Sequence, residues 1–330
     1  MTTERAPGAR PRFSVVMNVY NGSAWLEQTL VSLFAQTFTD GELIFFDDRS
    51  TDDSPALLDP YRADPRVRYV LAQQQVPLGQ ARAQAVALAH GEWLAFLDQD
   101  DLWTPDKLAL QAQVIDCWHG PELAIVYGRA MKFGAPRVPH DFDHWHEFGD
   151  LPQGDIFEAL FIDSCFICQS AVCLRTDLAQ ALGDMPAEHR FCPDYYYYTQ
   201  LASRYATACT QQVVCWYRVH ALAMSRERYA EVLQEMLLIA QCWRHRLSPA
   251  TYERRCRIQH TMLALRELAT PGLRQEGWRH LWQQGSWPYL LSRPFARTWR
   301  ELRRAWRRGT GPAPQVPTFT LQAPAAQGPR

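Results

Sequence analysis

Two periodicities of apolar residues alternate along the first part of the chain. Short runs rich in Val, Ile, Leu and Phe predict buried strands, since β-branched and aromatic side chains favour extended backbone. Between these runs, apolar residues recur three and four positions apart, which is the spacing of one helix face. Strands that alternate with helices predict an α/β fold with a mostly parallel sheet. The predicted strands are Phe13–Val19, Leu43–Phe46, Val67–Leu71, Trp93–Leu97 and Leu123–Tyr127.

Turn and capping residues mark where the intervening helices begin. Asn21-Gly22 predicts a turn, and Ser23 is a suitable N-cap for a helix whose apolar face includes Leu26 and Leu30. An Ala-rich helix is expected from Gly79 to His90, with Gly91 closing it. A further helix begins at Thr104-Pro105-Asp106, because proline is favoured in a first helical turn.

Acidic residues follow two of the predicted strands. Asp47 and Asp48 come after the second strand, and Asp98, Asp100 and Asp101 come after the fourth. Ligands of open parallel sheets bind beyond the carboxyl ends of the strands, so both groups should face one crevice. Mg²⁺ and Mn²⁺ prefer oxygen ligands and often combine one or two carboxylates with substrate phosphates. An isolated Asp-x-Asp more often belongs to an ordinary turn.

The pattern becomes irregular after Gly128. An acidic loop spans 141–163, a strand is expected near Phe166–Leu174, a helix over about 194–204 and further strands over 207–219. From about Glu227 the chain reads as helical, and beyond Gly309 it is rich in Pro and Gly with little to bury, which is typical of disorder.

Composition narrows the class of protein. Hydrophobic residues make up 47% and charged residues 21% of 330 residues, so the chain can build a substantial core. The formal net charge of −1 argues against a dedicated nucleic-acid binder. No run reaches the roughly 18 apolar residues of a membrane helix, and Met1–Arg12 lacks the apolar stretch of a signal peptide. We therefore expect a cytoplasmic protein.

Two groups of metal-capable residues have simpler explanations than zinc. Cys165 and Cys168 form a CxxC, but the apolar residues around them favour core thiols. His140, His144 and His146 lie in the acidic, irregular segment, which favours a loop on the acceptor side.

Several local motifs occur together in a fixed order. They are Phe13-Ser-Val-Val-Met-Asn-Val-Tyr-Asn21, Gln36-Thr-Phe-Thr-Asp40, Phe46-Asp-Asp-Arg-Ser-Thr-Asp-Asp53, Ala81-Arg82 and Gly91-Glu-Trp-Leu-Ala-Phe-Leu-Asp-Gln-Asp-Asp-Leu-Trp-Thr-Pro-Asp-Lys107. This set strongly resembles the family 2 inverting glycosyltransferases with the GT-A fold, over about Phe13 to Ser225. The resemblance implies a nucleotide-diphosphate-sugar donor, with UDP as the preferred nucleotide, and a Mn²⁺ or Mg²⁺ cofactor.

The resemblance also implies roles for individual donor-side residues. Tyr20 and Asp48 match positions that hold the nucleotide base, with Asp47 assisting. Arg82 matches an arginine near the base and diphosphate. Asp98 is similar to the residue that meets the ribose or the metal.

The remaining matched positions concern the metal and the acceptor. Asp100 is similar to the metal ligand that bridges the diphosphate, and His220 lies in Tyr217-Arg218-Val219-His220, which looks like the family's Arg-x-His element near the metal. Asp194 matches the general base, although Pro193 stands where the family usually has Glu. Arg49 likewise stands where Gly is common.

These roles imply one direct displacement. A metal stabilises the charge on the departing diphosphate while Asp194 takes the proton of the acceptor hydroxyl, which inverts the anomeric centre. The acceptor is expected to be a saccharide or a lipid-linked saccharide in surface polysaccharide synthesis. The alternatives are a sugar nucleotidyltransferase, although Tyr20-Asn21-Gly22-Ser23 is not a Gly-rich triphosphate loop, and a non-catalytic saccharide- or membrane-binding scaffold.

The domain organisation follows from these assignments. We expect a flexible segment over 1–12, a GT-A domain over 13–226 divided at 128 into nucleotide-sugar and acceptor halves, a helical region over 227–308 and a disordered tail over 309–330. Seven Arg occur between Arg293 and Arg308 at helical spacing with Trp299 and Trp306. This segment is either a basic helix that binds an anionic membrane surface or a helix packed on the domain, and the first alternative would place the protein at the inner face of the membrane.

Overall fold

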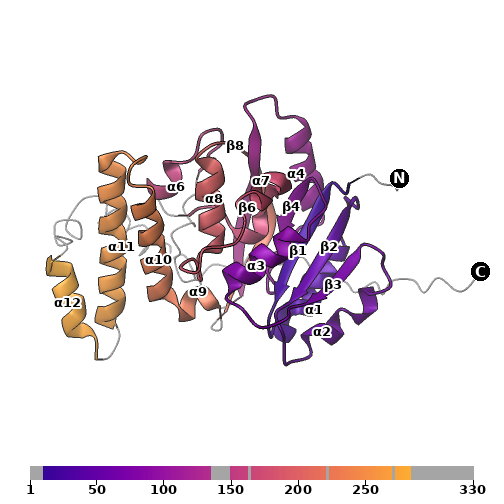
Figure 1. Ribbon diagram of the computed structural model, residues 1–330, viewed down its shortest axis with the longest axis horizontal. Coiled ribbons are helices and arrows are strands. Elements are labelled where there is room, and N and C mark those ends of the chain that lie inside the picture. The colour runs from indigo at the N-terminus through magenta and orange to yellow at the C-terminus, as the bar shows by residue number, and fades with distance from the viewer. Residues whose placement is uncertain (1–9, 135–148, 163–164, 221–222, 270–271, 284–330) are drawn as a thin grey trace, which may run out of the picture.

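The computed structural model describes residues 10–134, 149–162, 165–220, 223–269 and 272–283, and these form one mixed α/β unit around an eight-stranded sheet (Figure 1). The sheet order is β3-β2-β1-β4-β7-β6-β8-β5. The strands are β1 (Phe13–Val19), β2 (Gly41–Asp47), β3 (Val67–Leu71), β4 (Trp93–Phe96), β5 (Leu102–Trp103), β6 (Leu123–Gly134), β7 (Val172–Arg175) and β8 (Ala206–Val219).

Strand direction divides the sheet into two parts. Strand β1 pairs in parallel with β2 and β4, and β2 pairs in parallel with β3. Strand β7 is antiparallel to both β4 and β6, β6 and β8 are parallel, and β5 is antiparallel to β8. The α/β class and the parallel first half are therefore confirmed, and the second half is a mixed sheet.

The strands β1, β2 and β4 are buried on both faces of the sheet along most of their length, which explains why they are largely apolar. Alternate residues point to opposite faces: Val15 and Met17 belong to one apolar core, while Val16 belongs to the other. Helices α1 (Ser23–Phe34) and α4 (Lys107–Asp116) cover the first face, and α3 (Leu78–Ala87) covers the second. The short helix α2 (Ser54–Leu57) and the 3-10 turn η1 (Asp59–Tyr61) follow β2.

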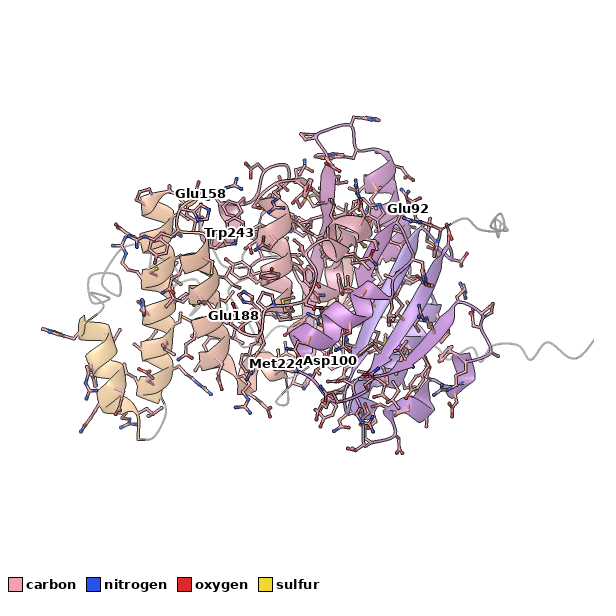
Figure 2. All side chains as sticks on the ribbon, in the orientation of Figure 1. Glu92, Asp100, Glu158, Glu188, Met224 and Trp243 are labelled. Carbon is pink, nitrogen blue, oxygen red and sulfur yellow. The ribbon has the colours of Figure 1, made fainter. Side chains whose placement is uncertain are left out.

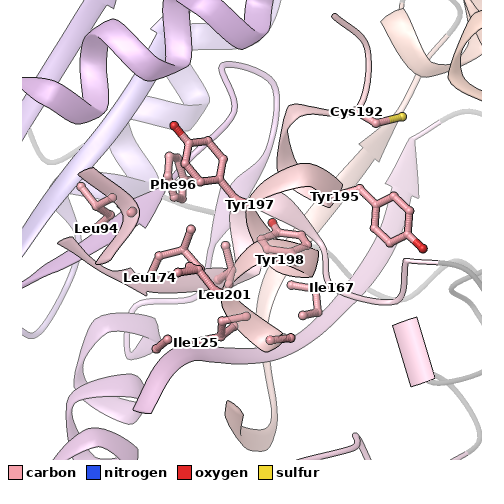
Figure 3. Packing of buried hydrophobic residues seen from close by; sticks show 14 of the residues in the cluster. Leu94, Phe96, Ile125, Ile167, Leu174, Cys192, Tyr195, Tyr197, Tyr198 and Leu201 are labelled. Atoms are coloured by element: carbon pink, nitrogen blue, oxygen red, sulfur yellow. The ribbon is translucent and has the colours of Figure 1, made fainter. Parts of the chain in front are cut away.

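The second core also contains α8 (Pro193–Ala202), whose tyrosines pack beside the sheet (Figure 3). Tyr195, Tyr197 and Tyr198 are buried. The Tyr195 hydroxyl donates to the Leu160 carbonyl at 3.0 Å, and the Tyr198 hydroxyl donates to Gln169 Oε1 at 2.6 Å. These three rings are therefore part of the core.

The structure departs from the sequence-based expectation in three places, two of them in the acceptor half. The expected strand over Phe166–Leu174 is only β7, because a 3-10 turn, η2 (Gln169–Ala171), occupies the middle of the apolar run. The strands expected over 207–219 are one long strand, β8. The strand β5 was not expected, since two residues give no periodicity. Short helices α6 (Ala159–Ile162) and α7 (Thr176–Gln180) complete the acceptor half.

Helices follow the sheet at the C-terminal side, and α8, α10, α11 and α12 succeed one another away from it in Figure 1. They comprise α9 (Met224–Glu227), α10 (Tyr229–Cys242), α11 (Pro249–Ala269) and α12 (Arg274–Gln283). The described helices include none with the length and apolar character needed to cross a bilayer. The basic segment 293–308, the tail 309–330 and His140, His144 and His146 lie outside the described residues.

Candidate functional site

The loop after β1 is tied to the loop after β4 by one side chain, Gln99. Its Oε1 accepts the Tyr20 backbone N–H at 2.9 Å, and its Nε2 donates to the Tyr20 carbonyl at 3.1 Å. Gly22 leaves room for this side chain, because a Cβ at Gly22 would lie 2.4 Å from Gln99 Oε1. The Tyr20 side chain itself is 42% exposed, so its ring is available to a ligand.

Two residues in adjacent strand-end loops adopt left-handed backbone. Asn21 has φ of 48° and Arg49 has φ of 65°. Asparagine tolerates this region well, whereas arginine adopts it at a cost. The Arg49 guanidinium offsets that cost by donating to the carbonyls of Ala72 and Gln73 at 3.3 and 3.1 Å. Arg49 thus fastens the loop after β2 to the loop after β3.

The two aspartates after β2 have different environments. Asp47 is fully buried, and its oxygens accept from the Ser50 N–H at 2.8 Å and the Tyr69 hydroxyl at 2.7 Å. Asp48 accepts the Val76 N–H at 3.2 Å, and burial raises its pKa. Asp47 therefore holds the loop together, while Asp48 has one oxygen that can meet a further donor.

Arg82 and Asp98 form an ion pair on the floor of the site. Arg82 Nη2 lies 3.0 Å from Asp98 Oδ1, and the Arg82 side chain is 5% exposed, compared with 37% for Asp98. Burial raises the pKa of Asp98 to about 6, Arg82 opposes the shift, and the charges of Asp100 and Asp194 add to it. The pair therefore places a buried cation among three carboxylates.

Asp100 and His220 meet although they lie far apart in the sequence. His220 Nε2 is 2.7 Å from Asp100 Oδ2, and the ring of Trp25 on α1 packs against His220 with centroids 4.0 Å apart and the ring planes tilted by 35°. His220 Nδ1 is buried and has no hydrogen-bond partner among the residues that the structure describes. A carboxylate oxygen beside an imidazole nitrogen is a donor set that Mn²⁺ or Mg²⁺ accepts when phosphate oxygens complete it. Asp100 is labelled in Figure 2.

A second network fixes the segment that carries these aspartates. Ser170 on η2 donates to Asp101 Oδ2 at 2.6 Å, and its oxygen accepts the Asp98 N–H at 3.1 Å. From the other side, the Arg218 N–H donates to Asp101 Oδ1 at 2.8 Å, and Arg218 Nε donates to the Asp100 carbonyl at 2.7 Å. Asp101 is thus a structural carboxylate that joins η2 and β8 to the site.

Asp194 reaches the same region from the first turn of α8. Burial raises its pKa, and the positive charge of Arg82 acts against that shift. Its charge in turn raises the pKa of Asp98. Asp194 is therefore close enough to the Arg82–Asp98 pair to interact with it electrostatically, although it comes from another element.

Asp101 also lies in a cluster with two thiols. One oxygen of Asp101 and the sulfurs of Cys168 and Cys215 are within 4.8 Å of one another, and all three residues are buried. Both Asp101 oxygens already accept hydrogen bonds, and the buried Lys107 ammonium lies near Cys215. A cation there would compete with Lys107, so the cluster fits a polar core better than a metal centre.

Comparison with known proteins identifies the family. Residues 14–182 match the profile of Glycosyl transferase family 2, which is about half of the chain. The chain belongs to this family. Chondroitin synthase of Escherichia coli, one similar family relative, is 37% identical over 101 residues, which are 30% of this chain and 15% of that protein. The matches to the first curated relatives cover between 13% and 42% of their lengths.

Solved structures place the family 2 domain in the GT-A fold. S. aureus TarS 1–349 superposes with a TM-score of 0.59 at 20% identity and covers 81% of this chain and 77% of that one. The mannosyltransferase PcManGT from Pyrobaculum calidifontis, in complex with GDP-Man and Mn²⁺, superposes with a TM-score of 0.57 at 19% identity, covering 93% and 88%. At these identities the likeness establishes the fold.

The sequence predicted most of the strand-end residues but missed those that hold them. Gln99, Ser170, Trp25 and Arg218 contact the predicted residues through pairings between distant segments. Gln99 lies within the Asp98–Asp101 motif and Arg218 within the motif that contains His220, so both could have been predicted as site residues from these motifs. For Ser170 and Trp25 the sequence offered no such signal.

Proposed function

We propose that the protein transfers a sugar from a nucleotide-diphosphate donor to a hydroxyl of a saccharide or lipid-linked saccharide, with inversion at the anomeric carbon. One observation carries this proposal: the start of α8, which bears Asp194, packs on α3, which bears Arg82. A Cβ at Gly79 of α3 would lie 3.5 Å from Pro193 Cβ, and the charge of Arg82 acts on the Asp194 carboxyl. The proposed donor site and the proposed base would therefore be adjacent, as a displacement reaction requires.

The donor side would bind a nucleoside diphosphate. Exposed Tyr20 and the available oxygen of Asp48 suit a nucleobase, and the buried Arg82 suits the diphosphate or the nearby sugar. TarS has been crystallised with UDP-GlcNAc, and PcManGT with GDP-Man. A uracil base is our preferred assignment for this chain.

Asp100 and His220 would hold a Mn²⁺ or Mg²⁺ ion together with the donor diphosphate. The fit rests on their 2.7 Å contact and on their mixed oxygen and nitrogen donors. When bound, such an ion supplies Lewis-acid stabilisation of the charge on the departing diphosphate.

Asp194 would act as the general base. Its raised pKa brings it closer to the pH at which a base works well, and Arg82 favours its charged form. The carboxylate takes the proton of the acceptor hydroxyl as that oxygen bonds to the anomeric carbon. The bond from this carbon to the diphosphate breaks, and the nucleoside diphosphate departs with the electron pair.

The setting of the reaction is proposed as surface polysaccharide synthesis. The family relative from Escherichia coli is a chondroitin synthase, which supports a saccharide acceptor. Association of the segment 293–308 with an anionic membrane surface stays a prediction from its Arg and Trp spacing.

The test is a donor panel on the purified protein. UDP-GlcNAc, UDP-glucose, UDP-galactose and GDP-mannose are incubated with Mn²⁺, with Mg²⁺ or with EDTA, and release of UDP or GDP is measured together with the melting temperature. We expect one donor to stabilise the protein and to be turned over with metal. Asp194→Asn should retain donor binding and lose turnover by at least about 100-fold.

The matched control is Asp106→Asn, which makes the same change at an exposed carboxylate whose side chain makes no capping bond to α4. It should behave as wild type. If no donor stabilises the wild type under any metal condition, the protein is a non-catalytic scaffold instead.

A further inference from the structure

A carboxylate lies on the buried face of α10, in the helical region that follows the GT-A sheet. The Glu235 side chain is 4% exposed and sits among the apolar residues Leu233, Met236 and Ile239. A buried carboxylate is costly unless hydrogen bonds compensate it. Its partners therefore indicate why this position is not apolar.

Those partners are three successive backbone N–H groups. Glu235 Oε2 accepts from Arg190 at 2.9 Å and from Phe191 at 2.7 Å, and Oε1 accepts from Cys192 at 2.8 Å. Hydrogen bonds to a charged acceptor are about twice as strong as neutral ones. One side chain thus fixes the whole segment 190–192.

This segment leads directly into Asp194. Pro193 is the first residue of α8 and has no N–H, so the Cys192 N–H is the last backbone donor before Asp194. The N-cap, Cys192, makes no side-chain capping bond. Glu235 therefore holds the residues on which the start of α8 depends, and Cys192 and Tyr195 at this start are labelled in Figure 3.

The opposite side of the same loop rests on α3, the helix of Arg82. A Cβ at Gly79 would lie 2.4 Å from the His189 carbonyl oxygen and 2.9 Å from Met185 Cγ. The loop is thus enclosed between α3, which bears Arg82, and α10, which bears Glu235. His189 Nδ1 also lies 3.8 Å from Glu235 Oε1.

We infer that Glu235 is a positioning residue for Asp194: it sets the start of α8 so that the Asp194 carboxylate stays beside the Arg82–Asp98 pair. This inference rests on the proposed function of Asp194 as the base. It assigns the C-terminal helices a part in the reaction, although they lie beyond the residues that match the family profile.

The experiment uses the full chain and the Glu235→Gln and Glu235→Ala variants. Gln keeps the shape but offers an amide N–H₂ toward N–H donors, so it loses at least one of the three bonds. Amide hydrogen exchange of the peptide spanning 186–196 is measured by mass spectrometry. Nucleotide release is measured with the four donors of the panel. Glu231→Gln, at a partly exposed position one turn earlier that pairs with Arg228, is the matched control.

We expect faster exchange at 190–192 in both Glu235 variants. We also expect the turnover number of the active donor to fall at least about tenfold, because misplacement of a reacting group by about 1 Å reduces the rate strongly. The KM of the donor should change less than about threefold, because the substitution does not alter the residues proposed to bind the donor. Glu231→Gln should match wild type. Glu235→Gln remains informative if Glu235→Ala does not fold.

Three results would overturn the inference. Unchanged exchange at 190–192 means that Glu235 does not hold the loop. Faster exchange with unchanged turnover means that the loop does not position Asp194. If the wild type turns over no donor, the proposed function of Asp194 as the general base is contradicted. This outcome is distinguishable from the other two because it is seen with the wild type, before any substitution is made.

Discussion

Asp100 Oδ2 lies 2.7 Å from His220 Nε2, which joins the loop after β4 to the end of β8 at the proposed metal position. We predict that His220→Ala raises the Mn²⁺ concentration for half-maximal donor turnover by about tenfold or more, since it removes one ligand. The measurement is turnover of the active donor against Mn²⁺ concentration.

The control for this substitution is His90→Ala. His90 pairs with Glu42 at 3.3 Å, but its side chain is 65% exposed and lies outside the site. It should leave the Mn²⁺ requirement unchanged. Equal Mn²⁺ curves for His220→Ala and wild type would remove His220 from the metal site.

The raised pKa of Asp98 predicts a pH dependence of stability in the absence of divalent ions. The pKa rises from 3.8 to about 6 on folding, chiefly through burial, so the native state holds this proton more tightly than the unfolded chain. Between pH 3.8 and about 6, Asp98 has largely lost its proton in the unfolded chain but keeps it in the native state. The contribution of Asp98 to the free energy of unfolding therefore falls as the pH rises. Asp98→Asn removes this effect.

The measurement is the melting temperature of Asp98→Asn minus that of wild type, in EDTA, from pH 4 to pH 8. We expect the difference to increase between pH 4 and about 6 and to level off above that. Asp106→Asn provides the reference for the loss of an exposed carboxylate. A difference that stays flat, or decreases, across this range contradicts the prediction.

Ser170 is predicted to stabilise both the fold and the donor site. Its hydroxyl donates to Asp101 and accepts the Asp98 N–H, so Ser170→Ala leaves a buried carboxylate oxygen and a partly buried N–H without this partner. We expect the free energy of unfolding to fall by about 1–3 kcal/mol, with a higher KM for the donor. Urea unfolding and donor titration measure the two effects.

Ser203→Ala is the corresponding control, since the Ser203 hydroxyl donates only locally to the Gln200 carbonyl at 2.7 Å. It should cost less stability and leave the KM unchanged. If both variants lose the same stability and neither alters the KM, Ser170 has no special part in the site.

Gly22 and Gln99 are predicted to act as one unit. The Cβ of Gly22→Ala would displace the Gln99 side chain from Tyr20, and this side chain can move, so the fold should be little affected. We expect Gly22→Ala and Gln99→Ala each to lower the affinity for UDP, and we expect the double variant to bind UDP as tightly as Gln99→Ala does. Calorimetric titration with UDP and Mn²⁺ tests this, and additive losses would contradict it.

The sequence was sufficient for elements that depend on near neighbours. The first four strands were predicted within one or two residues, since each is a compact apolar run. The run Phe166–Leu174 was predicted wrongly because its middle turns at η2, where Ser170 bonds to a loop about 70 residues away in the chain. Ser23 was expected as an N-cap, but Gly22 occupies that position.

The proposed site residues were predicted from their motifs, and the residues that hold them were not. Asp98, Asp100 and His220 follow strands, so topology brings them to one edge. Glu235 has no such motif: on a helix with Glu231 four residues earlier, it is indistinguishable from a surface carboxylate until the loop 190–192 is placed against it. The domain limits at 128, 226 and 308 stay predictions.

The two residues of β5 come directly after the Asp98–Asp101 segment and pair with Cys215 and Trp216 of β8. The loop after β4, which belongs to the proposed donor site, is therefore followed by a strand whose pairing partner lies more than 100 residues later in the chain. A chain that ended at β7 would lack the strand with which β5 pairs. Completion of the proposed donor site therefore depends on a strand that follows it far along the chain.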